Sequence, residues 1–135
     1  MPHIALTISG QPDAALTRSV AAAIADLTVE VLGKPRELIA LTLQYLDPAQ
    51  WIIDGQPLSE SGRNAFQLDI SITDETNTKA EKARYLQRMH AELSALIGEV
   101  HETSYIHVID ARAAAYGYGG LTQEQRYQAA RIAAA

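Results

Sequence analysis

The chain has 135 residues, of which 47% are hydrophobic and 20% charged, enough apolar side chain for one sizeable core in a single domain spanning residues 1–135. Its net charge of −5, with no run of lysines or arginines, argues against nucleic acid or an anionic membrane as a partner, because both bind basic faces. The absence of cysteine excludes disulfides and thiolate metal sites. Without a recognisable leader or an apolar run of about 18 residues, we expect a soluble cytoplasmic protein.

Residues 2–47 predict a strand, a helix and a second strand. The apolar run from Ile4 to Ile8 predicts the first strand. After a turn, apolar residues recur at the spacing of one helix face: Leu16, Val20, Ile24, Leu27 and Val31. Gly33 is placed to end this helix, and Pro35 blocks its continuation. The second strand is expected at Leu38–Leu43.

Residues 66–110 predict the same three elements again. Phe66 to Thr73 alternate between apolar and polar residues, as a half-buried strand does. Thr78 and Glu81 form the pattern of a capping box at the start of a helix. The apolar positions expected on its buried face are Leu86, Met89, Leu93 and Leu96. Gly98 ends the helix, and Tyr105 to Ile109 form the last strand.

The two halves therefore repeat one another, since Gly98 follows Gly33 by 65 residues and Leu68 follows Ile4 by 64. Two consecutive β-α-β units predict an α+β fold, with a four-stranded sheet and both helices on one face. We expect the opposite face to be apolar and uncovered, and hence to be buried by oligomerisation.

Two segments lie outside the repeat. Residues 48–65 form a polar linker that predicts a loop with at most a short edge strand. Residues 111–135 predict a C-terminal loop and helix, with Thr122 and Gln125 as a second capping box. The glycine-rich stretch from Tyr116 to Gly120 is expected to be a permissive loop whose two tyrosines reach a neighbouring subunit.

Pro2 and Lys34 are the candidate chemical groups. If Met1 is removed, Pro2 carries a free secondary amine, and the α-amino group is the least basic ammonium in a protein. Chance alone places proline at this position in about 5% of chains. Lys34 follows a helix C-terminus, where a cation either stabilises the helix dipole or binds an anion. Arg36 either shares that anion or is solvated.

Taken together, these residues resemble the tautomerase superfamily, above all its macrophage migration inhibitory factor branch and 4-oxalocrotonate tautomerase-like bacterial proteins. Gly33 to Pro35, followed by Leu38 to Ala40, is similar to the Gly-Lys-Pro and Tyr-Ile-Ala pattern of that branch. Ser104 to His107 stands where the family has Val-Tyr-Ile-Asn. The similarity extends over about the first 120 residues.

The resemblance implies a keto–enol tautomerase that acts on a small 2-keto acid of the arylpyruvate or oxalocrotonate type. Pro2 would be the catalytic base and acid, and Lys34 would hold the substrate carboxylate. Ile72 would line the pocket and contact substrate through its backbone, and Tyr105 would come from another subunit of a homotrimer. His107 would stand near the distal end of the substrate, where the family has an asparagine.

Two other functions stay open, namely a non-catalytic trimeric binding protein and a hydratase- or dehalogenase-type relative. Relatives that dehalogenate acrylates or decarboxylate malonate semialdehyde usually carry arginines where this chain has Asp74 to Asn77. The short oxalocrotonate branch carries arginines where this chain has Pro12 and Asp13. Tyr105 could also be ordinary sheet packing. The four histidines lack metal-binding spacing, so we expect neither a metal nor a cofactor.

Overall fold

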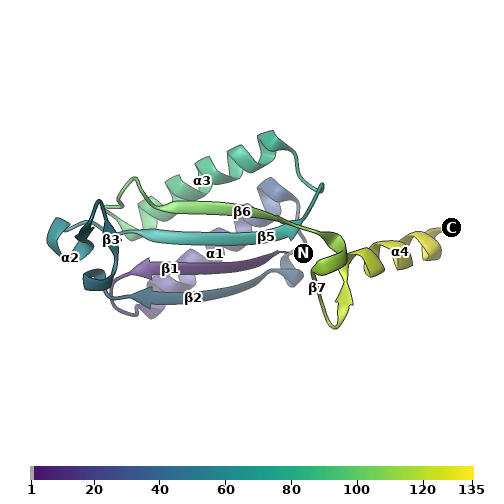
Figure 1. Cartoon of the computed structure of the whole chain (residues 1–135), viewed down its shortest axis with the longest axis horizontal. Coiled ribbons are helices and arrows are strands. Elements are labelled where there is room, and N and C mark those ends of the chain that lie inside the picture. Colours follow the sequence, from purple (N-terminus) through teal and green to yellow (C-terminus); the bar gives the residue numbers. More distant parts are fainter. Residues whose placement is uncertain (1) are drawn as a thin grey trace.

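The computed structural model describes residues 2–135 and has the predicted α+β architecture (Figure 1). A four-stranded sheet has the order β2-β1-β5-β6. Its strands are β1 (His3–Ser9), β2 (Ala40–Leu46), β5 (Phe66–Thr73) and β6 (Tyr105–Ala111). Pairing is parallel within each β-α-β unit and antiparallel between the central strands β1 and β5. The two units therefore run in opposite directions across one sheet.

Helices α1 (Ala14–Leu32) and α3 (Lys79–Ile97) cover the same face of the sheet, as predicted. Asp13 caps α1 by accepting a hydrogen bond from the Leu16 backbone N–H, and Gly33 ends the helix in the left-handed region at a φ of 68°. The Thr78–Glu81 capping box begins α3, which confirms that prediction. Both helices start and stop at the signals carried by their own sequences.

The core lies between the sheet and these two helices. Its strand residues are Ile4, Leu6, Ile8, Phe66, Leu68, Ile70 and Ile72, and its helix residues include Val20, Ile24, Met89 and Leu93. The Thr28 hydroxyl donates to the Ile24 carbonyl and accepts from the Tyr85 hydroxyl at 2.9 Å, so one buried hydrogen bond joins the helices. Burial raises the pKa of Tyr85 to about 12.

Two predicted details in these units are wrong. Strand β2 begins at Ala40 instead of Leu38, because the short 3₁₀ helix η1 (Arg36–Leu38) follows Pro35. Leu86 and Leu96 are 37% and 38% exposed, because the buried face of α3 is centred on Tyr85, Met89 and Leu93. Tyr85 occupies the core position that the apolar pattern assigned to Leu86.

The linker contains more regular structure than the predicted loop. It forms the 3₁₀ helix η2 (Pro48–Gln50), a two-stranded hairpin of β3 (Ile52–Ile53) and β4 (Gln56–Pro57), and the short helix α2 (Leu58–Ser61). Leu58 is buried, and its backbone N–H donates to the Trp51 carbonyl. These contacts fold the linker onto one end of the sheet.

The C-terminal segment from Ala113 to Ala134, here called the C-terminal arm, projects from the opposite end of the sheet, where the N-terminus lies (Figure 1). It comprises the 3₁₀ helix η3 (Ala113–Ala115), strands β7 (Gly117–Tyr118) and β8 (Leu121–Thr122), and helix α4 (Gln123–Ala134). The expected glycine loop is thus a tight hairpin, because Gly119 and Gly120 both adopt positive φ. The Thr122–Gln125 capping box is present as predicted.

The uncovered face of the sheet is polar, contrary to the predicted apolar face. Alternation along each strand sends the apolar residues toward the helices and leaves mainly polar ones on the other side. The polar and aromatic residues of this open face are His3, Thr7, Thr42, Gln44, Gln67, Asp69, Ser71, Tyr105 and His107, and its apolar residues include Ala5, Ala40 and Ile109. The sheet therefore provides no hydrophobic argument for association. Within residues 2–135, no helix is long and apolar enough to cross a membrane.

Candidate active site

Pro2 is buried immediately before the central strand β1. Its carbonyl accepts a hydrogen bond from the Ala40 backbone N–H at 3.2 Å, which attaches it to the start of β2. On the other side, His3 pairs with Ser71, so the same antiparallel register places Pro2 beside Ile72. The residue is thus held at one end of the sheet between two strands. Met1, whose removal the prediction requires, lies outside the described residues.

Ile72 lies beside Pro2, but its side chain belongs to the core and is 0% exposed. Only its backbone is close to the end of β1. This position is compatible with the backbone contact implied by the resemblance and leaves no role for the side chain in contacting a ligand.

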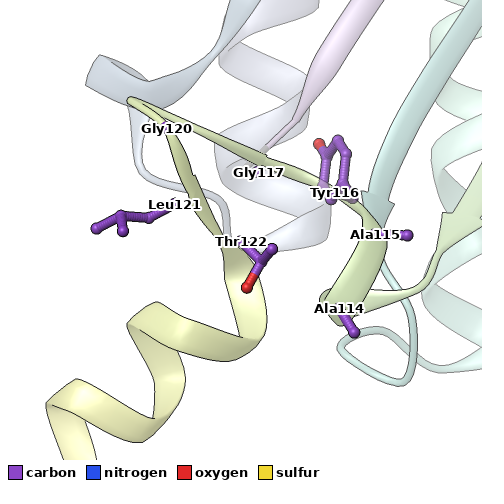
Figure 2. A pocket seen from close by; sticks show the side chains of 7 residues that line it. All are labelled: Ala114, Ala115, Tyr116, Gly117, Gly120, Leu121 and Thr122. Carbon is purple, nitrogen blue, oxygen red and sulfur yellow. The ribbon is translucent and has the colours of Figure 1, made fainter.

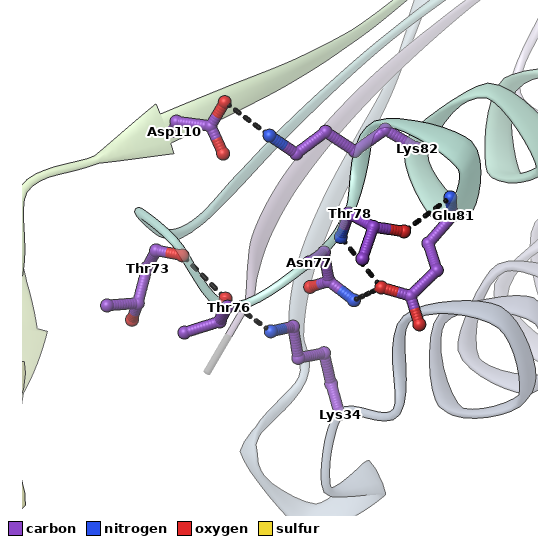
Figure 3. Close-up of polar contacts among 8 residues, drawn as sticks. All are labelled: Lys34, Thr73, Thr76, Asn77, Thr78, Glu81, Lys82 and Asp110. Carbon is purple, nitrogen blue, oxygen red and sulfur yellow. Dashed lines mark hydrogen bonds and ion pairs between the residues drawn. The ribbon is translucent and has the colours of Figure 1, made fainter.

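Lys34 brings a buried cation to the same end of the sheet (Figure 3). Its Nζ donates to Thr76 Oγ1 at 2.9 Å, and the Thr76 hydroxyl in turn donates to the carbonyl of Thr73 at 2.6 Å. Thr73 ends strand β5, one residue beyond Ile72. Burial lowers the pKa of Lys34, and the nearby Glu81 carboxylate partly opposes that shift.

The charge of Lys34 is not neutralised by an ion pair within residues 2–135. Its partner Thr76 is a neutral hydroxyl whose proton is already donated to a backbone carbonyl. A buried ammonium in this condition favours an anionic ligand, because a bound anion would offset its desolvation.

Arg36 is engaged elsewhere, since its guanidinium lies 2.6 Å from Asp26 on the exposed side of α1. Both side chains are more than half exposed. The proposed sharing of an anion between Lys34 and Arg36 therefore requires this surface pair to open, and it stays a prediction.

Within one chain, Tyr105 lies toward the other end of the sheet, and His107 lies near the middle of the edge strand β6, which β5 separates from β1. Tyr105 pairs with Gln67, which pairs with Thr7, four residues along β1 from His3, or about 13 Å at the rise of a strand. It is 68% exposed on the open face. His107 faces Asp69, with Nδ1 and Oδ1 4.0 Å apart, so the two form an ion pair only when the imidazole is protonated. The fold of one chain does not bring either residue to Pro2.

Tyr116 contributes a contact at the Pro2 end that sequence reasoning placed elsewhere. Its hydroxyl donates to the Ser71 carbonyl at 2.8 Å, next to the start of β1. Burial raises its pKa, and a hydrogen bond with the His3 backbone partly lowers it. The side chain therefore contacts its own sheet, whereas the sequence interpretation directed it to a neighbouring subunit. The glycine-rich pattern predicted a permissive loop and gave no sign of the hairpin that directs Tyr116 back to the sheet.

Two hollows flank the C-terminal arm. One, here called the arm cleft, has a volume of about 350 Å³ and is lined by Leu38, Thr73 and Thr76 from the sheet end and by Tyr118, Gln123, Arg126 and Tyr127 from the arm. The other, about 330 Å³, is lined by η3 and the β7–β8 hairpin (Figure 2). The arm cleft is the one that contains Thr76, the hydrogen-bond partner of Lys34.

In the described part of the chain, no group of three or more histidines, aspartates or glutamates is arranged to hold a metal ion. The groups that this end of the sheet provides include Pro2, the buried ammonium of Lys34 and nearby hydroxyl groups.

No protein-family model matches the sequence, and a search of curated proteins finds no match. Solved structures do match. A fused 4-OT described as a wild-type symmetric trimer has a TM-score of 0.76 at 19% identity, covering 90% of this chain and 96% of that one. A malonate semialdehyde decarboxylase inhibited by 3-bromopropiolate gives 0.72 at 20% identity, covering 93% and 95%. MIF2 of Leishmania major gives 0.73 at 18% identity, covering 90% and 97%.

The chain has the fold of the tautomerase superfamily. The likeness spans nearly the whole length of each chain and confirms the fold implied by the sequence resemblance. The matched tautomerase-fold proteins are described with different chemistries, so the fold by itself does not select a reaction.

Proposed function

We propose that this chain is a keto–enol tautomerase of small 2-keto acids, with Pro2 as the general base and acid. The observation that carries the proposal is that a buried Pro2 and a buried Lys34 lie at the same end of a sheet that has the tautomerase fold. Processing of Met1 is part of the proposal, because the nitrogen of an internal proline is an amide and cannot accept a proton.

In the proposed reaction, the neutral Pro2 amine takes a proton from the carbon beside the ketone. The C–H electron pair forms the carbon–carbon double bond of the enol, and the ketone oxygen receives the proton from the prolinium. The reverse path returns the proton to carbon. Burial disfavours the prolinium, so we expect a pKa below that of an exposed amine and a useful fraction of free base near neutral pH.

Lys34 is proposed to hold the substrate carboxylate and to stabilise the enolate that develops beside it. A fixed cation in a site that excludes water lowers the energy of such an anion more than it would in bulk water. The protonated form of Lys34 is required, and this form dominates below its pKa.

A homotrimer is proposed as the active assembly. Several of the matched fused 4-OT structures are described as trimers. Tyr105 and His107 would then reach the Pro2 site of a neighbouring subunit, because within one chain both lie on the edge strand β6, which β5 separates from β1. We also infer a cytoplasmic location, and no requirement for a metal or cofactor.

The competing functions predict different results. A non-catalytic trimeric binding protein would retain Met1 or show no turnover. A dehalogenase- or hydratase-type relative would act on 3-haloacrylates or acetylenic acids, and one matched protein is described as inhibited by 3-bromopropiolate. At the start of α3, however, the Lys34 ammonium contacts Thr76, and Asp74 to Asn77 offer no arginine to bind such an acid.

The proposal is tested by following the ketonisation of phenylenolpyruvate while the intact mass of the same preparation is measured. The expected result is turnover by protein that has lost one methionine, with Pro2→Ala reducing kcat/KM by a factor of roughly 10²–10⁴. Full activity of Pro2→Ala would overturn the proposed base. Turnover of 3-haloacrylates without ketonisation would favour the dehalogenase-type alternative.

A further inference from the structure

Arg126 supplies a second positive charge close to the candidate site. It lies on α4 and lines the arm cleft together with Thr76, whose hydroxyl accepts a hydrogen bond from Lys34. The other lining residues are threonine, leucine, tyrosine and glutamine, so no carboxylate contributes to this wall. In a chain with a net charge of −5, this hollow is lined by one cation, Arg126, and by Thr76, whose hydroxyl accepts a hydrogen bond from a second cation, Lys34.

The guanidinium of Arg126 is held in place by the β7–β8 hairpin. Its Nη2 donates to the Tyr118 carbonyl at 2.9 Å, and its central carbon lies 3.8 Å from the centroid of the Tyr118 ring. Its Nε is buried and has no hydrogen-bond partner within residues 2–135. Because Nε is buried, a carboxylate in the cleft would be bound by the two outer nitrogens, Nη1 and Nη2, which can donate two parallel hydrogen bonds to it.

We propose that Arg126 is a second anion-binding residue of the site and that it grips the substrate carboxylate together with Lys34. This inference rests on the proposed function for the identity of the ligand as a 2-keto acid. The C-terminal arm thereby becomes part of the substrate site, and Arg126 sets its preference for acids over uncharged ketones of the same shape.

Benzoylformate is the probe that separates binding from catalysis. It is a 2-keto acid with no hydrogen on the carbon beside the ketone, so it cannot enolise. Its methyl ester has the same aromatic ketone without the charge. Affinities of the full-length protein for both compounds would be measured by isothermal titration calorimetry or by NMR titration.

The matched variants are Arg126→Gln and Arg131→Gln, which remove the same charge from the same helix. Arg131 does not line the arm cleft. We expect Arg126→Gln to weaken benzoylformate binding by roughly ten- to a hundredfold, as the loss of a hydrogen bond between charged groups does, and Arg131→Gln to leave it unchanged. Arg126→Lys should restore part of the affinity, because it keeps the charge and loses the paired donors.

Circular dichroism of each variant shows whether the C-terminal arm still folds. If Arg126→Gln does not fold, the affinity of Arg126→Lys for benzoylformate is compared with that of Arg131→Gln instead. Equal affinities for Arg126→Gln and Arg131→Gln, or a wild-type protein that does not bind benzoylformate, would overturn the inference. Failure of the tautomerase proposal gives a different pattern, in which benzoylformate binding depends on Arg126 but phenylenolpyruvate is not ketonised.

Discussion

The two β-α-β units share one scaffold and differ in chemistry. Helices α1 and α3 both have 19 residues and start 65 positions apart, and β2 and β6 both have seven residues with the same offset. At matching positions, Lys34 of the first unit corresponds to Glu99 of the second, and Ala40 corresponds to Tyr105. Pro2 corresponds to Phe66 at the offset of 64 residues that relates the core strand positions.

The antiparallel pairing of β1 with β5 places these matching positions at opposite ends of the sheet. One end holds Pro2 and the ammonium of Lys34, and the C-terminal arm projects from it. The other end has a hollow of about 310 Å³ lined in part by Phe66 and Tyr105, where no residue can carry a free amine. The two equivalent ends of this duplicated fold therefore carry different chemical groups.

The largest effect that would sharpen this comparison comes from substituting the matching residues Pro2, just before β1, and Phe66, the first residue of β5. Pro2→Ala should reduce kcat/KM for ketonisation by roughly 10²–10⁴, with little change in stability. Phe66→Leu should leave kcat/KM unchanged and lower the free energy of unfolding by about 1 kcal/mol, because Phe66 is fully buried in the core. Steady-state kinetics and urea unfolding distinguish the two. The comparison breaks if Phe66→Leu abolishes activity in a folded protein.

The second effect concerns the residues that follow the two helix-ending glycines. Lys34→Gln should raise KM for a 2-keto acid by roughly tenfold or more, as expected for the loss of a hydrogen bond between charged groups. Glu99→Gln, at the matching exposed position, should leave KM unchanged. Equal effects of both substitutions on KM would show that overall charge, and not the site at the Pro2 end, controls substrate binding.

The dependence of kcat/KM on pH should report the titration of Pro2 and of Lys34, the two candidate groups of the first unit. Activity should rise with pH as Pro2 loses its proton and fall again as Lys34 loses its charge. Because burial lowers the pKa of Lys34, the descending limb should lie below the ordinary value of 10.5. Lys34→Arg should move that limb upward, since arginine stays protonated. A descending limb that is unchanged in Lys34→Arg would assign it to another group.

The smallest expected effect compares two threonine–tyrosine hydrogen bonds. Thr28→Val should lower the free energy of unfolding by about 1–3 kcal/mol, because the buried Tyr85 hydroxyl would lose its partner. Thr17→Val should cost less than about 1 kcal/mol, because the Tyr45 hydroxyl keeps its bond to the Asp13 carbonyl and is partly solvated. Urea denaturation measures both changes in the free energy of unfolding. Equal losses for the two variants would contradict the larger contribution expected of the buried Thr28–Tyr85 hydrogen bond.

The helices and strands of the two β-α-β units could be predicted from the sequence because the signals that define them are local. Apolar periodicity, the Thr78–Glu81 capping box and the helix-ending Gly33 each act within a few residues, and the structure confirms them. The sheet with both helices on one face then follows from two consecutive β-α-β units. Pro2 and Lys34 could be selected as candidates because each is chemically distinctive at its position.

The parts that sequence reasoning missed depend on contacts between distant residues. The polarity of the open face becomes visible only when the strands are placed in register, which sets Asp69 beside His107. The turn of the β7–β8 hairpin brings Tyr116 back to Ser71 and places Arg126 on the arm cleft, and neither contact has a local signature. The roles of Tyr105 and His107 depend on a second subunit and remain predictions.

The central claim is that Pro2 carries a free amine of lowered pKa at one end of the duplicated sheet. The most direct test is a pH titration followed by nitrogen NMR of protein labelled in its proline residues. We expect one proline nitrogen signal that titrates as an amine, with a pKa below that of an exposed amine, and we expect this signal to be absent from Pro2→Ala. Only amide-type proline signals, unchanged across the titration, would contradict it.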